Sequence, residues 1–173
     1  MGQVVSQREL ISRRGEWKRT GHVVVCAYGA FDLLHPGHIR LLEEARDFGD
    51  LLAIAVQSDA AARAASAIPN NLHTWPNDIA RPITPAEERA EILAALTAVD
   101  FAAVADAPLA EFLQQFQPDV FVCGDERDGR QSAAASNSLD RSLAAIGCKL
   151  VRVPLEPGYS TSRLIERITG RRA

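Results

Sequence analysis

Two histidines three residues apart, His35 and His38, are the strongest candidates for chemistry in this chain of 173 residues. They lie at the end of residues 28–38, whose sequence is YGAFDLLHPGH. An imidazole can donate hydrogen bonds to phosphate oxygens and can carry a proton near neutral pH. Pro36 suits the first position of a helix, and the unpaired N–H groups of a helix start favour an anion. The stretch therefore predicts a phosphate-binding site with two potential proton donors.

Two glycines in the same stretch fit this interpretation. Gly29 and Gly37 remove side chains where a ligand would have to approach the backbone closely. A single histidine at a helix start is usually a solvated residue or a helix cap. A pair of histidines around a glycine, placed after a first strand, favours a functional site over that simpler interpretation.

A second candidate site lies late in the chain, at residues 158–162 with the sequence GYSTS. It again precedes a predicted helix, now with hydroxyl groups that could cap the helix or bind a phosphate. Capping by Ser160 or Thr161 is the simpler interpretation, and the two roles are compatible. A third candidate is the pair Gly124 and Asp125, which follows an apolar run and has capping of a turn as its simpler interpretation.

The elements that must position these residues are predicted from hydrophobic periodicity. Apolar runs predict about five strands, at residues 23–27, 51–56, 101–104, 119–123 and 149–153. Helical patterns lie between and after them, at residues 36–48, 60–67, 85–96, 109–116, 139–146 and 163–169. Strands that alternate with helices predict an α/β fold with a doubly wound parallel sheet. Ligands bind at the carboxyl ends of the strands in such sheets, and all three candidate motifs follow strands.

Two of the helices have apolar faces that should pack on the sheet. The first face comprises Ile39, Leu41, Leu42, Ala45 and Phe48, and the second comprises Ile92, Leu93 and Leu96. Residues 1–20 are expected to form an N-terminal helix or arm before a single domain at residues 21–173. The loop at residues 68–79, which contains His73 and Trp75, is either an ordinary surface loop or a substrate lid.

Composition narrows the class of protein. A formal net charge of −3 argues against a nucleic-acid or anionic-membrane binder. No stretch approaches the ~20 apolar residues that span a bilayer, and the N-terminus has no signal-peptide pattern. The three cysteines, Cys26, Cys123 and Cys148, lack the spacing of a metal site. We therefore expect buried thiols in a cytoplasmic protein.

The first motif resembles the signature of the HIGH-type nucleotidyltransferases, and its pattern G-x-F-D-x-x-H-x-G-H resembles their cytidylyltransferase-like branch. That branch includes glycerol-3-phosphate cytidylyltransferase and the adenylyltransferase that makes ADP-heptose. Residues 158–162 resemble the late G-x-S-T-[ST] motif, and residues 81–89 resemble a segment of the sugar-nucleotide enzymes. The resemblance covers about residues 22–169. It implies a Rossmann-like fold and transfer of a nucleoside monophosphate to a phosphorylated substrate, with release of pyrophosphate.

The resemblance also assigns roles to residues. It implies that His35 and His38 are catalytic and that Asp32, Arg63 and Arg89 bind the phosphorylated substrate. The residues implied to bind the nucleotide are Tyr28, Gly29, Ala30, Phe31, Gly37, Gly124, Asp125, Ser160, Thr161 and Ser162. Mg²⁺ would accompany the nucleoside triphosphate without a dedicated protein site. Residues 94–100 match a segment near the dimer contact of relatives, which implies a homodimer.

Three functions stay open at this point. The first is adenylyl transfer from ATP to a sugar 1-phosphate such as heptose 1-phosphate. The second is cytidylyl transfer from CTP to glycerol 3-phosphate or another alcohol phosphate. The third is a nucleotide-binding regulatory domain without turnover, which is suggested by the absence of lysine between Lys18 and Lys149.

Overall fold

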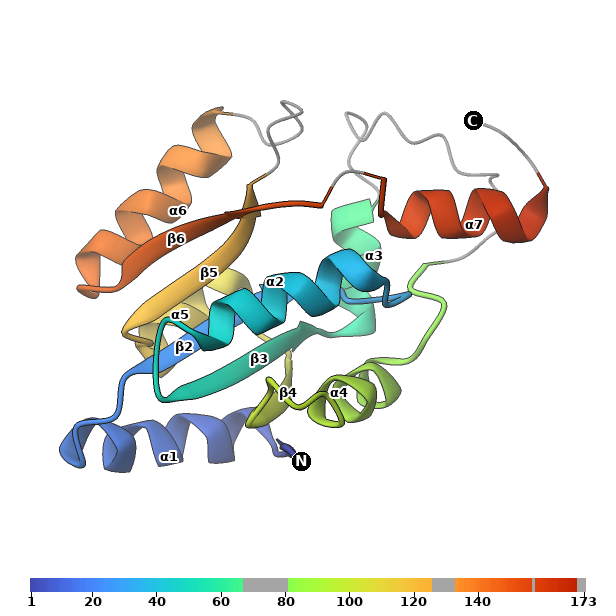
Figure 1. Ribbon diagram of the computed structural model, residues 1–173. Coiled ribbons are helices and arrows are strands. Elements are labelled where there is room, and N and C mark those ends of the chain that lie inside the picture. Colours follow the sequence, from blue (N-terminus) through green and yellow to red (C-terminus); the bar gives the residue numbers. More distant parts are fainter. Residues whose placement is uncertain (67–80, 126–132, 157, 171–173) are drawn as a thin grey trace.

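The structure is a computed structural model that describes residues 1–66, 81–125, 133–156 and 158–170. Six parallel strands form one sheet in the order β1-β4-β3-β2-β5-β6 (Figure 1). The strands are β1 (Gln3–Val4), β2 (Val24–Gly29), β3 (Leu51–Gln57), β4 (Phe101–Ala105), β5 (Val120–Asp125) and β6 (Lys149–Pro154). Together with the helices between them, they confirm the doubly wound α/β prediction.

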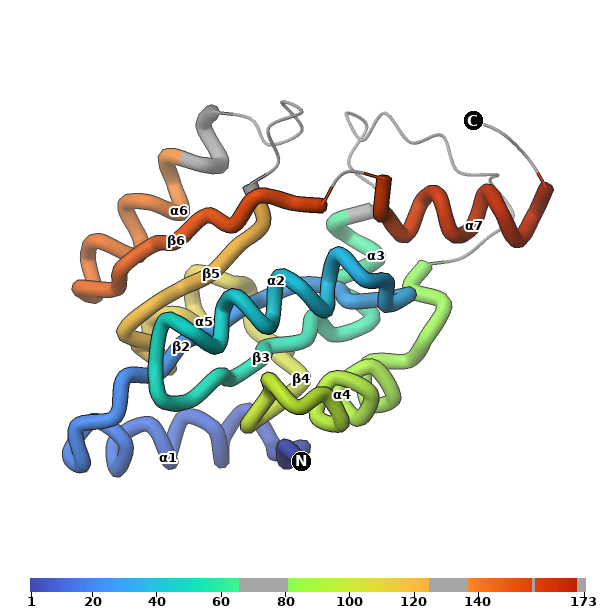
Figure 2. Tube along the Cα trace, in the orientation of Figure 1, coloured from blue at the N-terminus to red at the C-terminus, as the bar shows by residue number. Residues whose placement is uncertain are grey.

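Helices cover both faces of this sheet (Figure 2). The described helices are α1 (Gln7–Arg19), α2 (Pro36–Arg46), α3 (Asp59–Ser66), α4 (Ala86–Ala94), α5 (Leu109–Phe116), α6 (Ala133–Ala145) and α7 (Thr161–Thr169). Helices α2 and α4 pack on one face, and α1, α5 and α6 pack on the other. Helix α7 lies beyond the carboxyl ends of the strands, near the start of α2 (Figure 1).

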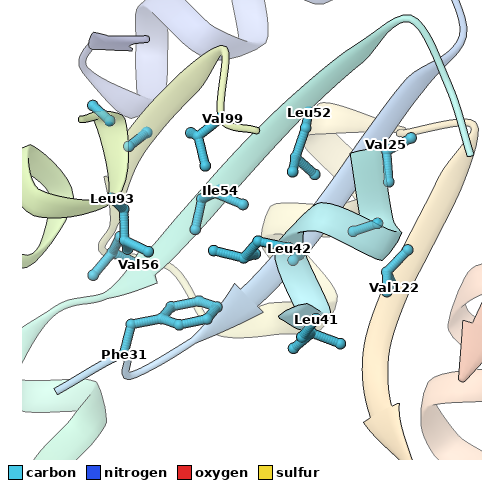
Figure 3. Close-up of a cluster of buried hydrophobic side chains, with 14 of the residues drawn as sticks. Val25, Phe31, Leu41, Leu42, Leu52, Ile54, Val56, Leu93, Val99 and Val122 are labelled. Atoms are coloured by element: carbon cyan, nitrogen blue, oxygen red, sulfur yellow. The ribbon is translucent and has the colours of Figure 1, made fainter. Parts of the chain in front are cut away.

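The core consists of two hydrophobic clusters, one on each face of the sheet, because successive side chains of a strand point to opposite faces. In β2, Val25 and Ala27 join the cluster under α2 and α4. Val24 and Cys26 join the cluster under α1, α5 and α6. Figure 3 shows the first cluster, with Phe31 at its edge. The central strands β2 and β3 are therefore buried on both sides, as their continuous apolar runs predict.

The strand order fixes where a ligand can bind. From β2 the chain moves through β3 to β4 on one side, and it then returns to place β5 and β6 on the other side of β2. The topology therefore switches between β2 and β5, which is the position where open α/β sheets bind their ligands. The turn after β2 and the residues that end β5 both lie at this point.

The N-terminal segment belongs to the same layered structure. The apolar pattern predicted about five strands and did not predict the two-residue strand β1, because Gln3 and Val4 are too short a run. Gly2, just before β1, donates its backbone N–H to the carbonyl of Ala94 at 2.9 Å. The N-terminal segment therefore contacts part of residues 94–100, the segment predicted to lie near a dimer contact. The predicted N-terminal helix is present as α1 and buries Leu10 against the sheet. A homodimer through residues 94–100 stays a prediction.

Other expectations need correction in detail. Ile39 and Ile92 are 37% and 47% exposed, so the apolar stripes of α2 and α4 are narrower than predicted. Helix α6 begins at Ala133 and not at residue 139, because its first turns are alanine-rich and carry little hydrophobic periodicity. The loop at residues 68–79, with His73 and Trp75, lies outside the described residues. No helix in the described part of the chain is both long and apolar enough to span a membrane.

Asp119 joins three elements at the amino ends of the strands. Its Oδ2 accepts the backbone N–H of Val24 at 2.8 Å, and its Oδ1 accepts from Nη2 of Arg14 at 2.7 Å. Arg14 lies on α1, is 6% exposed and also donates to the carbonyl of Gln117. This carboxylate therefore fixes α1 against β2 and the start of β5.

We expect Asp119→Ala to lower the free energy of unfolding by about 2–4 kcal/mol, because it leaves a buried guanidinium without its carboxylate and a strand N–H unpaired. Asp140→Ala is the matched control, since it removes an exposed ion pair with Arg152 and should cost less than about 1 kcal/mol. Urea denaturation measures both. Equal losses in the two variants would show that the Asp119 contacts do not carry this stability.

Candidate active site

The first turn of α2 is organised by His35, the N-cap residue, whose backbone is extended (φ −142°, ψ 166°). Its Nδ1 accepts the backbone N–H of His38 at 3.3 Å, and Pro36 occupies the first helical position, as predicted. Because Nδ1 is an acceptor, neutral His35 carries its proton on Nε2. The cap thus leaves an N–H donor on the far side of the ring.

The two predicted catalytic imidazoles are stacked. Their centroids are 3.8 Å apart with an interplanar angle of 15°, and Phe31 meets the ring of His38 edge-on at 5.5 Å. Burial, with a smaller effect of His35, lowers the pKa of His38 to about 4. Burial also lowers the pKa of His35. Both rings are therefore predominantly neutral near pH 7, and an anion bound beside them would raise both pKa values.

The glycine between the histidines is required by packing. A Cβ at Gly37 would lie 3.1 Å from Nδ1 of His35 and 3.3 Å from Cβ of Tyr159. These distances are tighter than ordinary van der Waals contact, so a side chain here would displace the capping imidazole or the segment before α7. Gly37 therefore allows both motifs to come together.

The late motif forms the second side of the site. Ser160 is the N-cap of α7, and its Oγ accepts the N–H of Arg163 at 3.1 Å. Thr161 donates from Oγ1 to the carbonyl of Leu33 at 3.4 Å, and Ser162 is buried. The N-termini of α2 and α7 are thus brought side by side, and each favours an anion.

Arg40 holds the two sides together, a role that the sequence did not reveal. Its Nη1 lies 2.6 Å from Oε1 of Glu156, and its guanidinium lies over the Tyr159 ring at 5.6 Å. Arg40 has the position of an ordinary solvated residue on α2. Its partners Glu156 and Tyr159 follow β6, far along the chain from α2, so no local sequence spacing indicates the contact.

The candidate residues outside the two helix starts include Gly124 and Asp125 at the end of β5 and Tyr28 on β2. Gly124 faces Leu155, whose Cδ2 would lie 2.6 Å from an added Cβ, so this glycine accommodates a neighbouring side chain. Asp125 ends β5, but its side chain lies outside the described part of the chain. Tyr28 packs near Phe112 on the opposite face from α2, and burial raises its pKa. The described side chains thus do not place Tyr28 beside the histidines.

Asp32, predicted to bind the substrate, is instead saturated by protein donors. Its buried carboxylate accepts the N–H groups of Ile83 at 2.7 Å and Thr84 at 3.0 Å, and Nε of Arg81 at 3.0 Å. The side chain is 1% exposed. Asp32 therefore holds the segment before α4 against the turn after β2.

Arg89 is likewise enclosed and does not present its guanidinium to a ligand. It is 1% exposed and donates from Nε to the carbonyl of Thr84 at 2.8 Å and from Nη2 to Asp59 at 2.6 Å. Its Nη1 donates to the carbonyl of Ala30. The predicted phosphate contact would require these bonds to break, so the structure favours a positioning role for Arg89.

Arg63 keeps the exposed position that a substrate contact would require. It lies one turn into α3, the helix that follows the carboxyl end of β3.

Within the described residues, no group of three or more His, Cys, Asp and Glu side chains could hold a metal ion. The buried thiols of Cys26 and Cys148 are protonated, because burial raises the pKa of Cys148 to about 11 and that of Cys26 still further.

The histidine pair makes stability depend on pH. The pKa of His38 is about 4 in the folded protein and about 6.5 in an unfolded chain, so the unfolded state binds more protons between these values. The free energy of unfolding should therefore fall as the pH is lowered from 6.5 towards 4. His38→Gln should make this fall shallower in urea denaturation at pH 7 and pH 5. The same slope in both proteins would contradict the burial of a neutral His38.

Comparison with known proteins agrees with this geometry. The cytidylyltransferase-like family matches residues 26–167. The bifunctional protein HldE of Koribacter versatilis is 36% identical over 167 residues, which are 95% of this chain and 31% of that protein. The HldE protein of Syntrophotalea carbinolica is 36% identical over 156 residues, which are 89% of this chain and 28% of that protein. The chain thus spans about a third of the length of these curated relatives.

Solved structures show the same architecture. The lipopolysaccharide core biosynthesis protein from Thermoplasma volcanium superposes with a TM-score of 0.59 at 26% identity, over 79% of this chain and 98% of that one. Pantoate-beta-alanine ligase from Francisella tularensis superposes with a TM-score of 0.61 over 96% of this chain and 73% of that one. At 16% identity, the ligase shows the fold alone. The family match confirms the resemblance carried by residues 28–38 and 158–162: the chain belongs to the cytidylyltransferase-like family of nucleotidyltransferases.

Proposed function

We propose that this domain transfers a nucleoside monophosphate from ATP or CTP to a phosphorylated small molecule and releases pyrophosphate. The observation that carries the proposal is the juxtaposition of two helix N-termini at the switch point of the sheet, one of them bearing the stacked pair His35 and His38. A triphosphate is the kind of ligand that such a site favours. A sugar 1-phosphate such as heptose 1-phosphate is the leading acceptor, since the curated relatives are HldE proteins.

The proposed reaction is an in-line displacement at the α-phosphorus. A phosphate oxygen of the acceptor forms a bond to the α-phosphorus, while the bond from the α-phosphorus to the bridging oxygen breaks and pyrophosphate leaves. No covalent enzyme intermediate is needed, so catalysis depends on positioning and on neutralisation of charge. His35 would donate from Nε2 to a phosphate oxygen, and His38 would stabilise charge that develops as pyrophosphate departs.

The start of α7 would hold the β- and γ-phosphates through its free N–H groups. Mg²⁺ would arrive with the nucleotide substrate and would neutralise part of the phosphate charge. Of the three residues predicted to contact the acceptor, Arg63 keeps an exposed guanidinium. We therefore propose that Arg63, and not Arg89 or Asp32, meets a phosphate of the bound substrates.

We expect His35→Ala and His38→Ala each to lower the rate of pyrophosphate release by about two orders of magnitude or more, because each removes a group that stabilises transition-state charge. His22→Ala is the matched control. His22 precedes β2, at the opposite end of the strands from the site, and its Nδ1 lies 2.8 Å from Oγ1 of Thr20. This control should keep wild-type turnover. Circular dichroism checks that all three variants are folded.

The assay should pair each of ATP, CTP, GTP and UTP with a panel of sugar 1-phosphates and alcohol phosphates. Fast release with ATP and a sugar 1-phosphate would support the leading acceptor class, whereas release with CTP and glycerol 3-phosphate would identify the cytidylyl alternative. Nucleotide binding without turnover on any pair would favour a regulatory domain. Near-normal turnover in both histidine variants would contradict the mechanism itself.

A further inference from the structure

We infer that Phe31 is a positioning residue that fixes the orientation of the His38 imidazole, and that Arg89 and Asp32 hold Phe31 in the backbone conformation that this task requires. The inference rests on the proposed function, because it treats His38 as a group that acts on phosphates. The positioning of His38 by Phe31 is a property of the protein without ligand, so it can be tested without an activity assay.

The backbone of Phe31 is the first observation. Its φ of 47° lies in the left-handed region, which side chains other than glycine rarely adopt and which persists only where the surroundings determine it. Gln117 is the only other non-glycine residue with positive φ in the described ranges, and it ends helix α5, where this conformation is ordinary. Phe31 ends no helix, so its conformation needs another explanation.

The residues on either side of Phe31 are held by one segment of chain. The carbonyl of Ala30 accepts from the guanidinium of Arg89, and the carboxylate of Asp32 accepts from three donors within residues 81–84. Arg89 is fixed in turn by Asp59 at the start of α3. Both peptide neighbours are therefore clamped, and Phe31 between them has little freedom to relax.

The conformation places the Phe31 ring between the core and the active site. The residue is 6% exposed and belongs to the cluster under α2 (Figure 3). The ring packs over Gly29, where an added Cβ would lie 3.1 Å from Cε2. The ring meets that of His38 in a T-shaped contact, with an interplanar angle of 64°. The ring is thus wedged between fixed neighbours and the catalytic imidazole.

His38 depends on such a contact because hydrogen bonds do not fix its ring through Nδ1. That nitrogen is buried and has no partner within the described residues. The imidazole makes a T-shaped contact with Phe31 and stacks on His35, and His35 is the titratable neighbour that acts on its pKa. Ring contacts on two sides therefore set its orientation.

Phe31→Leu tests the inference, because leucine fills much of the core space but lacks the flat aromatic edge. Phe116→Leu is the matched control, since Phe116 is fully buried in the opposite cluster. NMR titration of the labelled imidazoles gives the pKa of His38, and pyrophosphate release gives kcat and the KM for the nucleotide. Urea denaturation reports the loss of packing in both variants.

In Phe31→Leu we expect the pKa of His38 to rise from about 4 towards about 5 or higher as the ring gains solvent. The value of kcat should fall about tenfold or more while the KM for the nucleotide changes less than about threefold, as for a misplaced catalytic group. Phe116→Leu should lose stability but keep the wild-type pKa and kcat. Equal effects in both variants, or an unchanged His38 in Phe31→Leu, would overturn the inference.

Arg89→Lys provides a second test of the inference, because lysine cannot donate to Ala30, Thr84 and Asp59 together. We expect the same change in the His38 titration as in Phe31→Leu, and an unchanged titration in a folded Arg89→Lys protein would contradict the role of the clamp. Absence of pyrophosphate release from the wild-type protein with every substrate pair would defeat the proposed function. The NMR comparison would still decide whether Phe31 positions His38.

Discussion

The carboxyl edge of this domain depends on one buried cation. Arg89 is removed from solvent, and a buried guanidinium is tolerated only when acceptors surround it. Its acceptors come from three separate places: the turn after β2, the start of α3 and the segment before α4. These segments cannot shift independently without leaving a charge unpaired. The turn that leads to the histidines is therefore built around a charge that itself stays out of the site.

The proposed site on this frame would bind negative charge without holding positive charge in advance. The histidine pair is neutral when free because burial opposes protonation of both rings. The helix starts at Pro36 and Thr161 supply partial positive charge through backbone N–H groups, which need no proton. In the proposed reaction, a bound triphosphate raises the pKa of both imidazoles and can draw a proton into the site. Ligand binding and the charge state of the site are coupled in this way.

The sequence predicts the parts of this structure that depend on local pattern. Continuous apolar runs and the helical spacing of α2 predicted the doubly wound sheet, and the motifs around His35 and Ser160 predicted two helix starts that the structure brings together. Long-range polar contacts were not predictable in this way. Arg89 reaches acceptors 59 and 30 residues away, and Arg40 on α2 pairs with Glu156 beyond the end of β6. A lone arginine on a helix carries no sign of burial, and only the family resemblance assigned Arg89 to a phosphate.

The most direct test is a crystal structure of this protein with Mg²⁺ and a non-hydrolysable ATP or CTP analogue. The account predicts one triphosphate between the two helix starts, with its α-phosphate beside His35 and its β- and γ-phosphates at the N–H groups after Ser160. The guanidinium of Arg89 should keep its bonds to Ala30 and Asp59. A triphosphate bound elsewhere, or one that contacts Arg89 directly, would contradict the account.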